Sequence, residues 1–333
     1  MDRITLSHGS GGKLMHELLK NMIAPSFGMS GILTDAAVLP LENGDQIAFS
    51  TDSYVVSPLF FPGGNIGDLA VNGTVNDLSM MGAVPQYLTA SFIIEEGFER
   101  EKLSIIAAAM CRAAEHGGVR IVSGDTKVVD KGKGDGLFVN TTGIGMLKKG
   151  ISIHPANIVP GDKIIISSSI GNHGVAVMSE RNGLSFDPPV LSDSAPLNGL
   201  VQHMLSVTEK IHALRDPTRG GLATTLKEIA QDTGFGIMVD EKHIPVEPGV
   251  VGACELLGLD PLYVANEGVL VAFVSPDVAE FLVHEMAGHP LAKRAVIIGE
   301  VTERNAKTVL LKTAIGGTRI IDMLTGEQLP RIC

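Results

Sequence analysis

The sequence has no tryptophan and only three cysteines among its 333 residues, and aromatic residues make up 4% of it. So few aromatic side chains argue against a platform on which single-stranded nucleic acid could stack. An odd number of cysteines, without any sign of an export signal, indicates reduced thiols rather than a disulfide framework. Positive charge is also scarce, because 26 Lys and Arg stand against 37 Asp and Glu, which argues against a surface that binds duplex nucleic acid.

Long hydrophobic runs are missing as well. No apolar stretch approaches the roughly 20 residues of a membrane span, and no basic segment followed by an apolar one opens the chain. We therefore expect a cytoplasmic protein. With 44% hydrophobic and 19% charged residues the chain has enough apolar surface to fold, and its length favours two domains.

Glycine is abundant, with 39 residues concentrated in turns between apolar strand-like runs and helical stretches. The mixed order of these elements predicts an α+β fold in each half rather than a doubly wound sheet. We expect a glycine-rich arm over residues 1–30, an N-terminal domain over 31–153, a C-terminal domain over 154–313 and a polar tail over 314–333. One of the strands predicted in the N-terminal domain covers Val119–Gly124.

Four aspartates adjoin small residues at predicted strand ends or on one helix, namely Asp35, Asp52, Asp77 and Asp125. Asp77 lies in the predicted helix Ile66–Met81 but off its polar stripe, where an unpaired buried carboxylate would cost several kcal/mol. Such a carboxylate must be paired, protonated or bound to a cation, and Mg²⁺ prefers carboxylate oxygens and brings phosphates with it. The alternative is that all four are caps or turn residues, the usual role of Asp beside Gly, Thr and Asn.

Two glycine-bearing segments could bind an anion. Residues 8–13, His-Gly-Ser-Gly-Gly-Lys, would let backbone N–H groups turn toward a phosphate, but they lack P-loop spacing and a preceding strand. A flexible arm is the equal alternative. Residues 215–221 open a predicted helix whose N-terminus, with Arg219, could hold an anion. Capping by Asp216 or Thr218 would alone explain most of that stretch.

The cysteines differ in their surroundings. Cys111 and Cys254 lie in helical patterns among apolar neighbours and are expected to be buried packing residues. Cys333 is the last residue, on a tail whose composition gives no reason to bury it, and it is not placed for prenylation. An exposed thiol without a function is an oxidation liability. A carrier thiol is therefore one interpretation, and an accidental terminal cysteine is the other.

Taken in order, these segments resemble one family along the whole chain. The stretches that carry the resemblance are 8–12, 49–56, 58–67, 124–129, 216–221, 254–259, 265–268 and the terminal Pro-Arg-Ile-Cys. They resemble the HypE family of nickel–iron hydrogenase maturation proteins, carbamoyl dehydratases within the PurM-like (aminoimidazole ribonucleotide synthetase-like) ATP-binding superfamily. One departure is Thr34, where many relatives carry a second acid beside Asp35.

The resemblance implies a PurM-like two-domain fold. The N-terminal domain would contribute strands to a β-barrel shared by a homodimer, with ATP bound near that interface, and a C-terminal α+β sandwich would carry a flexible tail. A partner, HypF, would place a carbamoyl group on the terminal thiol. ATP-dependent dehydration would then convert the S-carboxamide to a thiocyanate, and cyanide would pass to iron held by a HypC–HypD complex. Nucleic acid and membranes are not among the implied partners.

The resemblance also implies roles for individual residues. Cys333 would carry the carbamoyl group, and Lys127 and Glu267 would stabilise charge or act as the base, although a surface salt bridge is the alternative for both. The implied Mg²⁺ ligands are Asp35, Asp52, Asp77 and Asp125. The implied ATP-binding residues are Lys13, Thr51, Asp52, Asn65, Gly124, Thr126 and Asn140.

Other functions remain open on the sequence alone. A kinase or ligase of the same superfamily that acts on a free small molecule would need no terminal cysteine. A scaffold that binds nucleotide only to assemble partners would not turn ATP over. A third possibility, direct ligation of iron by Cys333, predicts stoichiometric iron without ATP. The sequence does not tell whether the tail rests inside or outside the ATP site.

Overall fold

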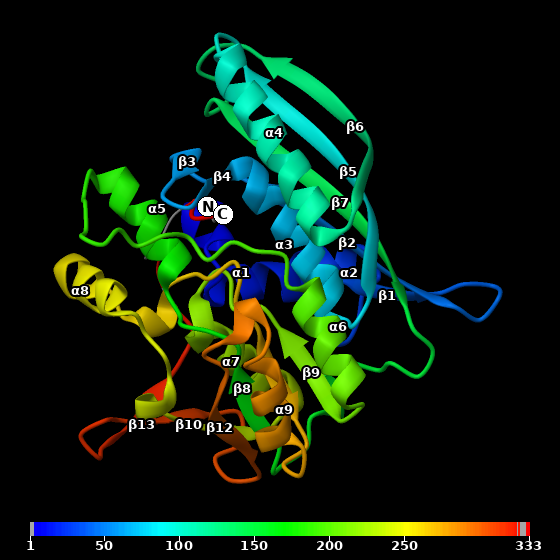
Figure 1. Ribbon diagram of the computed structural model, residues 1–333, viewed down its shortest axis with the longest axis vertical. Helices are drawn as coiled ribbons and strands as arrows, with labels where there is room; N and C mark the ends of the chain where they lie inside the picture. Colours follow the sequence, from blue (N-terminus) through cyan, green and yellow to red (C-terminus); the bar gives the residue numbers. More distant parts are fainter. Residues whose placement is uncertain (1–2, 325, 327–330) are drawn as a thin grey trace.

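The computed structural model describes residues 3–324, 326 and 331–333, which fold around two large β-sheets (Figure 1). Within these residues the first sheet has five strands, in the order β1 (Ala37–Pro40), β2 (Gln46–Tyr54), β7 (Leu137–Leu147), β5 (Val84–Glu95) and β6 (Arg120–Val129). The second sheet has seven strands, in the order β14 (Thr318–Ile321), β13 (Val309–Lys312), β10 (Gly236–Asp240), β12 (Val296–Thr302), β8 (Lys163–Ile166), β11 (Val271–Val274) and β9 (Ile211–Arg215). A ribbon of β3 (Phe60–Phe61) and β4 (Gly64–Asn65) stands apart. The predicted α+β content is confirmed.

Helices connect and cover these sheets. The α-helices are α1 (Lys13–Leu18), α2 (Ala24–Ser26), α3 (Ile66–Met80), α4 (Arg100–Gly117), α5 (Asn172–Asn182), α6 (Asn198–Val207), α7 (Gly221–Thr233), α8 (Pro248–Leu257) and α9 (Ala279–Met286). The shorter helical segments are η1 (Leu6–Gly9), η2 (Leu19–Ile23), η3 (Pro155–Asn157), η4 (Glu241–His243), η5 (Pro261–Tyr263) and η6 (Pro290–Ala292). Across the described part of the chain, no helix combines the length and apolarity that crossing a membrane requires.

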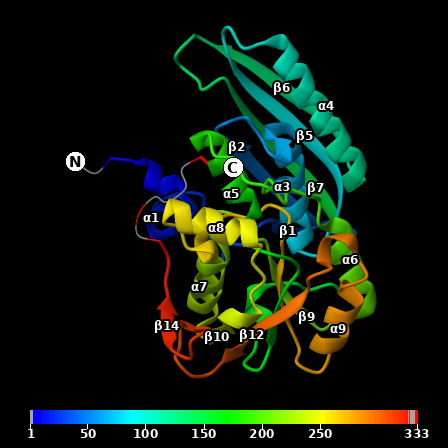
Figure 2. The same ribbon diagram turned by 60° about the vertical axis from the view of Figure 1, so that its left-hand side comes forward.

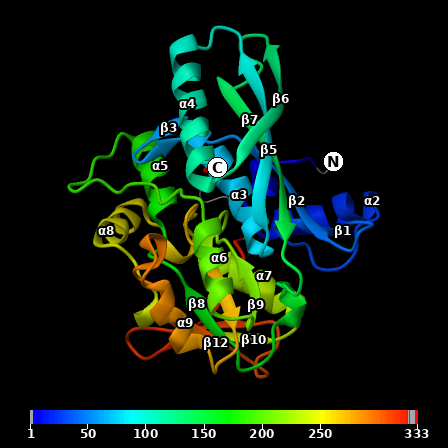
Figure 3. The same ribbon diagram turned by 45° about the vertical axis from the view of Figure 1, so that its right-hand side comes forward.

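One face of the first sheet is covered by α3, and α4 packs on α3 (Figure 3). The helix approaches closely at Gly143 of β7, where an added Cβ would lie 2.8 Å from the side chains of Leu78 and Thr74. The opposite face of the sheet stays open and presents Phe49 and Ile93 to solvent. Strand β6 is exposed along nearly its whole length and forms one edge of this sheet.

The central strand β8 of the second sheet is buried on both faces. Ile164 and Ile166 of β8 belong to a core with α7, whereas Ile165 between them belongs to a core with α6 and α9. Because successive side chains of a strand point to opposite faces, a continuous run of isoleucines is what a strand covered on both sides requires.

The polar stripe of α3 faces the second half of the chain. The Asn72 side-chain amide donates to Ser194 Oγ at 3.1 Å, and the Asn76 amide donates to the Glu267 carbonyl at 3.1 Å. The Asn76 Oδ1 in turn accepts from the Leu197 backbone N–H at 2.7 Å. These asparagines, which the sequence placed on one face of a helix, therefore join the first sheet's main helix to the loops of the second half.

Three details differ from the sequence-based expectations. The strand predicted over Val119–Gly124 continues to Val129 as β6. The predicted tail over 314–333 is wrong at its start, because β14 pairs with the otherwise open edge of β13. Cys111 was expected to be buried but is exposed, because it lies on the outer side of α4. Cys254 is buried as expected. The limits of the other predicted segments stay predictions.

Candidate active site

A cavity of about 340 Å³ lies between the two sheets. Five of the predicted site residues line it, namely Asp35, Asp52, Asp77, Glu267 and Cys333. The second half of the chain adds Arg215, Asp216 and Arg219. The cavity thus combines several carboxylates, two guanidinium groups and one thiol, which chain segments far apart in the sequence bring together.

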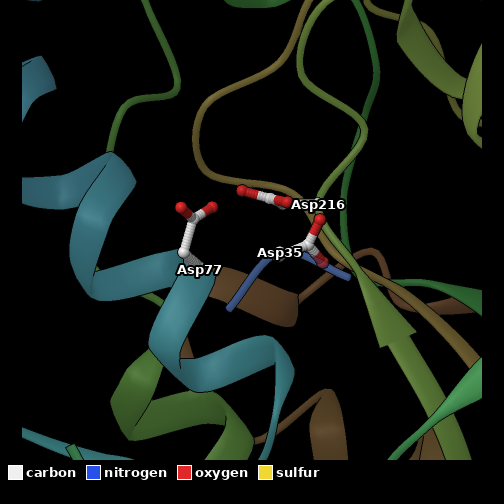
Figure 4. Close-up of side chains that lie close together, drawn as sticks. All are labelled: Asp35, Asp77 and Asp216. Atoms are coloured by element: carbon white, nitrogen blue, oxygen red, sulfur yellow. The ribbon is translucent and has the colours of Figure 1, made fainter. Parts of the chain in front are cut away.

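Three of these carboxylates form a cluster. One oxygen each of Asp35, Asp77 and Asp216 lies within 4.8 Å of the others. Figure 4 shows Asp77 projecting from its helix toward the other two, which come from facing segments. Among the described residues, this is the only group of three or more acidic, histidine or cysteine side chains that could hold a metal ion.

Burial makes these acids hard to ionise. It raises the pKa of Asp216 to about 8, with the Asp35 charge acting in the same direction. It raises the pKa of Asp35 to about 6, although the Arg215 guanidinium opposes this. The pKa of Asp77 is well above its usual range, because of burial first and then Asp52 and Asp216. Removing charged carboxylates from water while holding them together favours protonation or a bound cation.

Neighbouring side chains fix the orientation of the cluster. Ser50 donates its hydroxyl to Asp77 Oδ2 at 2.5 Å. Arg215 Nε lies 3.0 Å from Asp35 Oδ1, and another nitrogen of the same guanidinium lies 3.2 Å from Glu228 Oε2. Beside the cluster, the Tyr54 hydroxyl donates to Asp52 Oδ2 at 3.2 Å. Each of these contacts involves only one of the two oxygens of the carboxylate concerned.

The remaining oxygens fit a divalent cation. Asp35 Oδ2 and Glu267 Oε1 are buried and have no hydrogen-bond partner among the described residues. Hard cations such as Mg²⁺ take carboxylate oxygens of this kind and commonly bind phosphates at the same time. From the sequence alone, Asp216 was interpreted only as a helix cap. Its position at the start of the Asp-Pro-Thr-Arg-Gly-Gly segment, residues 216–221, was the available signal for a residue in the site.

The terminal segment enters the cavity. The Val55 backbone N–H donates to the Cys333 carbonyl at 3.1 Å, and the Ser57 N–H donates to the Arg331 carbonyl at 3.1 Å. Ile332 is 2% exposed and packs into a core that residues of both halves of the chain form. The sequence left open where the tail rests. In the structure Cys333 lines the cavity, and the apolar residue next to it anchors the end of the chain.

The cavity sets the chemistry of the thiol and of Glu267. Burial raises the pKa of Cys333 to about 12, against the opposing charge of Arg219. Glu267 is 3% exposed, and burial, followed by Asp216 and Asp193, holds its pKa well above the usual range. The Cys333 thiol is therefore protonated at neutral pH, and Glu267 is harder to ionise than an ordinary carboxyl group.

The N-terminal arm closes one side of the cavity. Gly11 and Gly12 line it. Gly11 has a φ of +78°, and an added Cβ would lie 2.5 Å from Arg219 Cβ, so only glycine allows this approach. The Lys13 backbone N–H donates to the Leu324 carbonyl at 2.9 Å. The Lys13 side chain is exposed, 3.8 Å from Glu17, and does not line the cavity.

The remaining predicted residues do not line this cavity. Asn65 caps α3, accepting from the Gly67 N–H at 2.8 Å. Asn140 donates its side-chain amide to the Asp52 carbonyl at 2.7 Å, and the Thr51 hydroxyl lies 2.9 Å from that of Thr142.

Four further predicted residues lie on the exposed strand β6, namely Gly124, Asp125, Thr126 and Lys127. Lys127 Nζ is 2.5 Å from Asp125 Oδ2, and both side chains are well exposed. The Lys127 ammonium and the Thr126 backbone N–H lower the pKa of Asp125. Within one chain, Asp125 is therefore separate from the three clustered aspartates, and Lys127 makes the surface ion pair that was the alternative to a catalytic role.

The fold and the carboxylate cavity define a class of protein. Residues 33–147 match the family described as "AIR synthase related protein, N-terminal domain", and residues 159–312 match the corresponding C-terminal domain. Together they make this a PurM-like protein.

Full-length relatives narrow the assignment. The chain is 51% identical over 333 residues to carbamoyl dehydratase HypE of Cupriavidus necator, covering 99% of this chain and 95% of that one. It superposes on HypE in a HypE–HypF complex with a TM-score of 0.87 and 49% identity, covering 92% of this chain and 99% of that one. For HypE in complex with ATP the TM-score is 0.84 at 46% identity, covering 99% and 100%. The chain belongs to the HypE family.

Proposed function

We propose that this protein catalyses the ATP-dependent dehydration of a carbamoyl group carried on its own Cys333, and that the resulting cyanide is donated to iron during assembly of a nickel–iron hydrogenase. The observation that carries the proposal is the docked terminus, which puts the Cys333 thiol in the same cavity as the Asp35, Asp77 and Asp216 carboxylates. The name of the relatives, carbamoyl dehydratase, agrees with this placement.

The chemistry explains why such a cavity is needed. Converting S–C(=O)–NH₂ to S–C≡N breaks the C–O bond and removes both protons from nitrogen, and hydroxide is a poor leaving group. ATP with Mg²⁺, when bound, supplies the phosphoryl group that lets the oxygen leave as phosphate. The protein then has to hold the carbamoyl group, exclude water and accept protons.

The residues of the cavity suit these tasks. Asp35, Asp77 and Asp216 would hold Mg²⁺, and Asp52 stands beside them as a further ligand. Glu267 is the candidate base. Its raised pKa makes the ionised form a stronger proton acceptor than an ordinary carboxylate.

Arg219 is the nearest positive charge that acts on Cys333, because its guanidinium lowers the pKa of that thiol against the effect of burial. The same charge would stabilise negative charge that develops on the carboxamide oxygen before it leaves. The HypE complex with ATP supports nucleotide binding by the family.

A homodimer would complete the site. Strand β6 is an open sheet edge on which Val128 is exposed, and the open face of the same sheet exposes Phe49 and Ile93, a pattern that favours pairing with a second sheet. We assign the second copy to this face. Asp125 and Lys127 would then act on nucleotide bound near the interface, together with the other β6 residues and Thr51 and Asn140 on the same sheet.

The partners follow from the same assignment. HypF would load the terminal thiol, which the solved HypE–HypF complex supports, and a HypC–HypD complex would receive the cyanide on its iron. Loading requires Cys333 to leave the cavity in which it is docked here. We place all of these reactions in the cytoplasm, where thiols stay reduced.

The test is the intact mass of the purified protein after incubation with HypF and its carbamoyl source, and again after Mg-ATP is added. We expect the gain of one carbamoyl group followed by the loss of one water, both on Cys333. A carbamoylated protein that hydrolyses ATP without losing water would contradict the proposal. Activity toward a free small molecule by a Cys333→Ala variant would favour a superfamily kinase or ligase.

A further inference from the structure

The last three residues are held by their backbone carbonyls. The donors are the Ser57 N–H and Arg181 Nη2 for the Arg331 carbonyl, His173 for the Ile332 carbonyl and the Val55 N–H for the Cys333 carbonyl. The Ser57 and Val55 donors are backbone groups of one segment. The terminus therefore binds along this segment in the way that an additional strand binds to a sheet edge. His173 contributes an imidazole, supplied by α5 from the other half of the chain.

His173 is fully buried at this contact. Its Nε2 lies 2.8 Å from the Ile332 carbonyl oxygen, and its ring stands edge-on to Phe61 with centroids 5.3 Å apart. Burial lowers the pKa of His173 to about 4, so the ring is neutral at physiological pH. A neutral imidazole carries one proton, and only the nitrogen that carries it can donate.

The Ile332 carbonyl determines which nitrogen holds the proton. A carbonyl oxygen can only accept, so its 2.8 Å contact with His173 puts the proton on Nε2. Nδ1 is then an acceptor, and it takes the hydroxyl hydrogen of Ser192 at 2.8 Å. The Ser192 oxygen in turn accepts from the Ser194 backbone N–H at 3.1 Å.

We propose that His173 is a positioning residue for the terminal thiol. Its Nε2–H binds the penultimate backbone carbonyl and so holds Cys333 in the carboxylate cavity, while the Ser192 hydroxyl binds Nδ1 on the other side of the ring. The consequence for catalysis rests on the function proposed above, whereas the retention of the terminus does not.

The same loop also supports the candidate base. Asp193, between the two serines, accepts hydrogen bonds from the backbone N–H groups of Glu267 at 3.3 Å and Gly268 at 3.2 Å. Residues 192–194 therefore support both the imidazole that holds the tail and the backbone of Glu267. The same loop therefore helps to position both the Cys333 thiol and the Glu267 carboxyl group.

Recognition through the penultimate carbonyl has a chemical advantage. The contact lies one residue away from the sulfur, so it is the same whether Cys333 is free, carbamoylated or cyanated. It also carries no charge. When the terminus leaves for a partner, the buried Nε2–H loses its acceptor, which favours return of the tail over permanent exposure.

The experiment compares two substitutions of similar size. An amide nitrogen of Gln reaches the position of imidazole Nε2, whereas that of Asn reaches only Nδ1, so His173→Gln can keep the Ile332 contact and His173→Asn cannot. Alkylation of Cys333 by iodoacetamide is followed by mass in a Cys111→Ser background, which removes the exposed thiol of α4. We expect the Asn variant to be alkylated about fivefold faster than its parent, as loss of one neutral hydrogen bond predicts. The Gln variant should stay near the parent rate.

The same proteins, once carbamoylated, are then given Mg-ATP. His173→Asn should form thiocyanate more slowly while its affinity for Mg-ATP, measured by calorimetry, is unchanged, and His173→Gln should restore most of the rate. Ser192→Ala keeps the imidazole but removes the hydroxyl that binds its Nδ1, and its rate of thiocyanate formation should lie between those of the two His173 variants. It is also the control for a folding defect caused by substitution at position 173. Equal alkylation rates in all four proteins would overturn the proposal. If the parent forms no thiocyanate while the order of alkylation rates holds, the proposed function fails and the role of His173 stands.

Discussion

Aspartate behaves in opposite ways in two regions of this molecule. In the cavity, Asp77 and Asp216 are crowded with another acid away from water, and burial raises the pKa of each. On β6, Asp125 is exposed, and the Lys127 ammonium beside it lowers its pKa. The difference teaches that ionising the carboxylates of the cavity costs free energy, which a bound cation can offset, whereas the exposed ion pair on the strand carries no such cost. In our proposal the strand gains a role only when a second copy covers it.

The largest effect should come from the thiol inside the cavity. Cys333→Ala should abolish thiocyanate formation completely, because no other thiol lines the cavity among the described residues to carry the carbamoyl group. Binding of Mg-ATP should be nearly unchanged. Mass spectrometry after carbamoylation and ATP addition checks the first point and calorimetry the second. Dehydration at the native rate in this variant would refute the carrier role.

The next largest effect concerns the cation. Asp77→Asn should weaken Mg-ATP binding by about 100-fold, because it removes a charged ligand from the cluster. The cation-free variant should unfold at the same or a higher temperature than the parent, since one source of buried repulsion is gone. Calorimetry and thermal unfolding measure the two quantities. Asp125→Asn is the matched change on the strand, and equal losses of affinity in both variants would erase the distinction between the two regions.

Breaking the proposed interface should have an intermediate effect. Val128→Asp places a charge on the exposed edge strand and should convert a dimer to a monomer by light scattering. We expect dehydration to slow by about tenfold, because the partner's β6 no longer reaches the nucleotide. The cavity itself lies within one chain and should still bind Mg²⁺. A parent protein that is monomeric at micromolar concentration with full activity would count against the dimer.

Stability should depend on pH in the direction set by the buried acids. The pKa of Asp35 rises to about 6 and that of Asp216 to about 8, both above their unfolded value near 4. Such groups bind protons more tightly in the folded state, so their contribution to stability is complete below about pH 4 and is lost as pH rises through the folded pKa values.

Thermal unfolding in chelator should therefore show a decline in Tm from about pH 5 to about pH 8, on the order of 2–4 °C. Mg²⁺ should raise Tm most at the upper end of this range, where the acids are ionised and free to bind it. Asp125 is exposed and should contribute nothing to this trend. An equal response to Mg²⁺ at both pH values would contradict the assignment of the cation site.

Much of this could be predicted from the sequence. The apolar strand runs and the helix around Asp77 follow from periodicity, and the metal-binding interpretation of Asp77 follows from an acid placed among apolar neighbours. Asp216 was missed as a site residue because a capping role explained it locally, and its distance to Asp35 depends on how two halves of the chain pack. No local pattern encodes such a distance.

The terminus shows the same limit. Its composition predicts exposure, yet Ile332 is buried by contacts with residues more than 150 positions away, such as His173. In the same way, the sequence predicts that the polar residues of α3 share one face of the helix. It does not predict that this face holds the backbone of Glu267. What escapes prediction is the pairing of remote segments.

The smallest predicted effect contrasts the two remaining cysteines. Cys254 is 1% exposed in the core that also holds Ile332, whereas Cys111 lies in water on α4. Cys254→Ala should lower the free energy of unfolding by about 1 kcal/mol, because it leaves a small void that the surroundings fill only partly. Cys111→Ala should change it by less than about 0.5 kcal/mol. Denaturant unfolding measures both, and thiocyanate formation should proceed in each variant. A loss of dehydration on changing Cys254 alone would mean that this core, and not only the cavity wall, sets the position of the docked terminus.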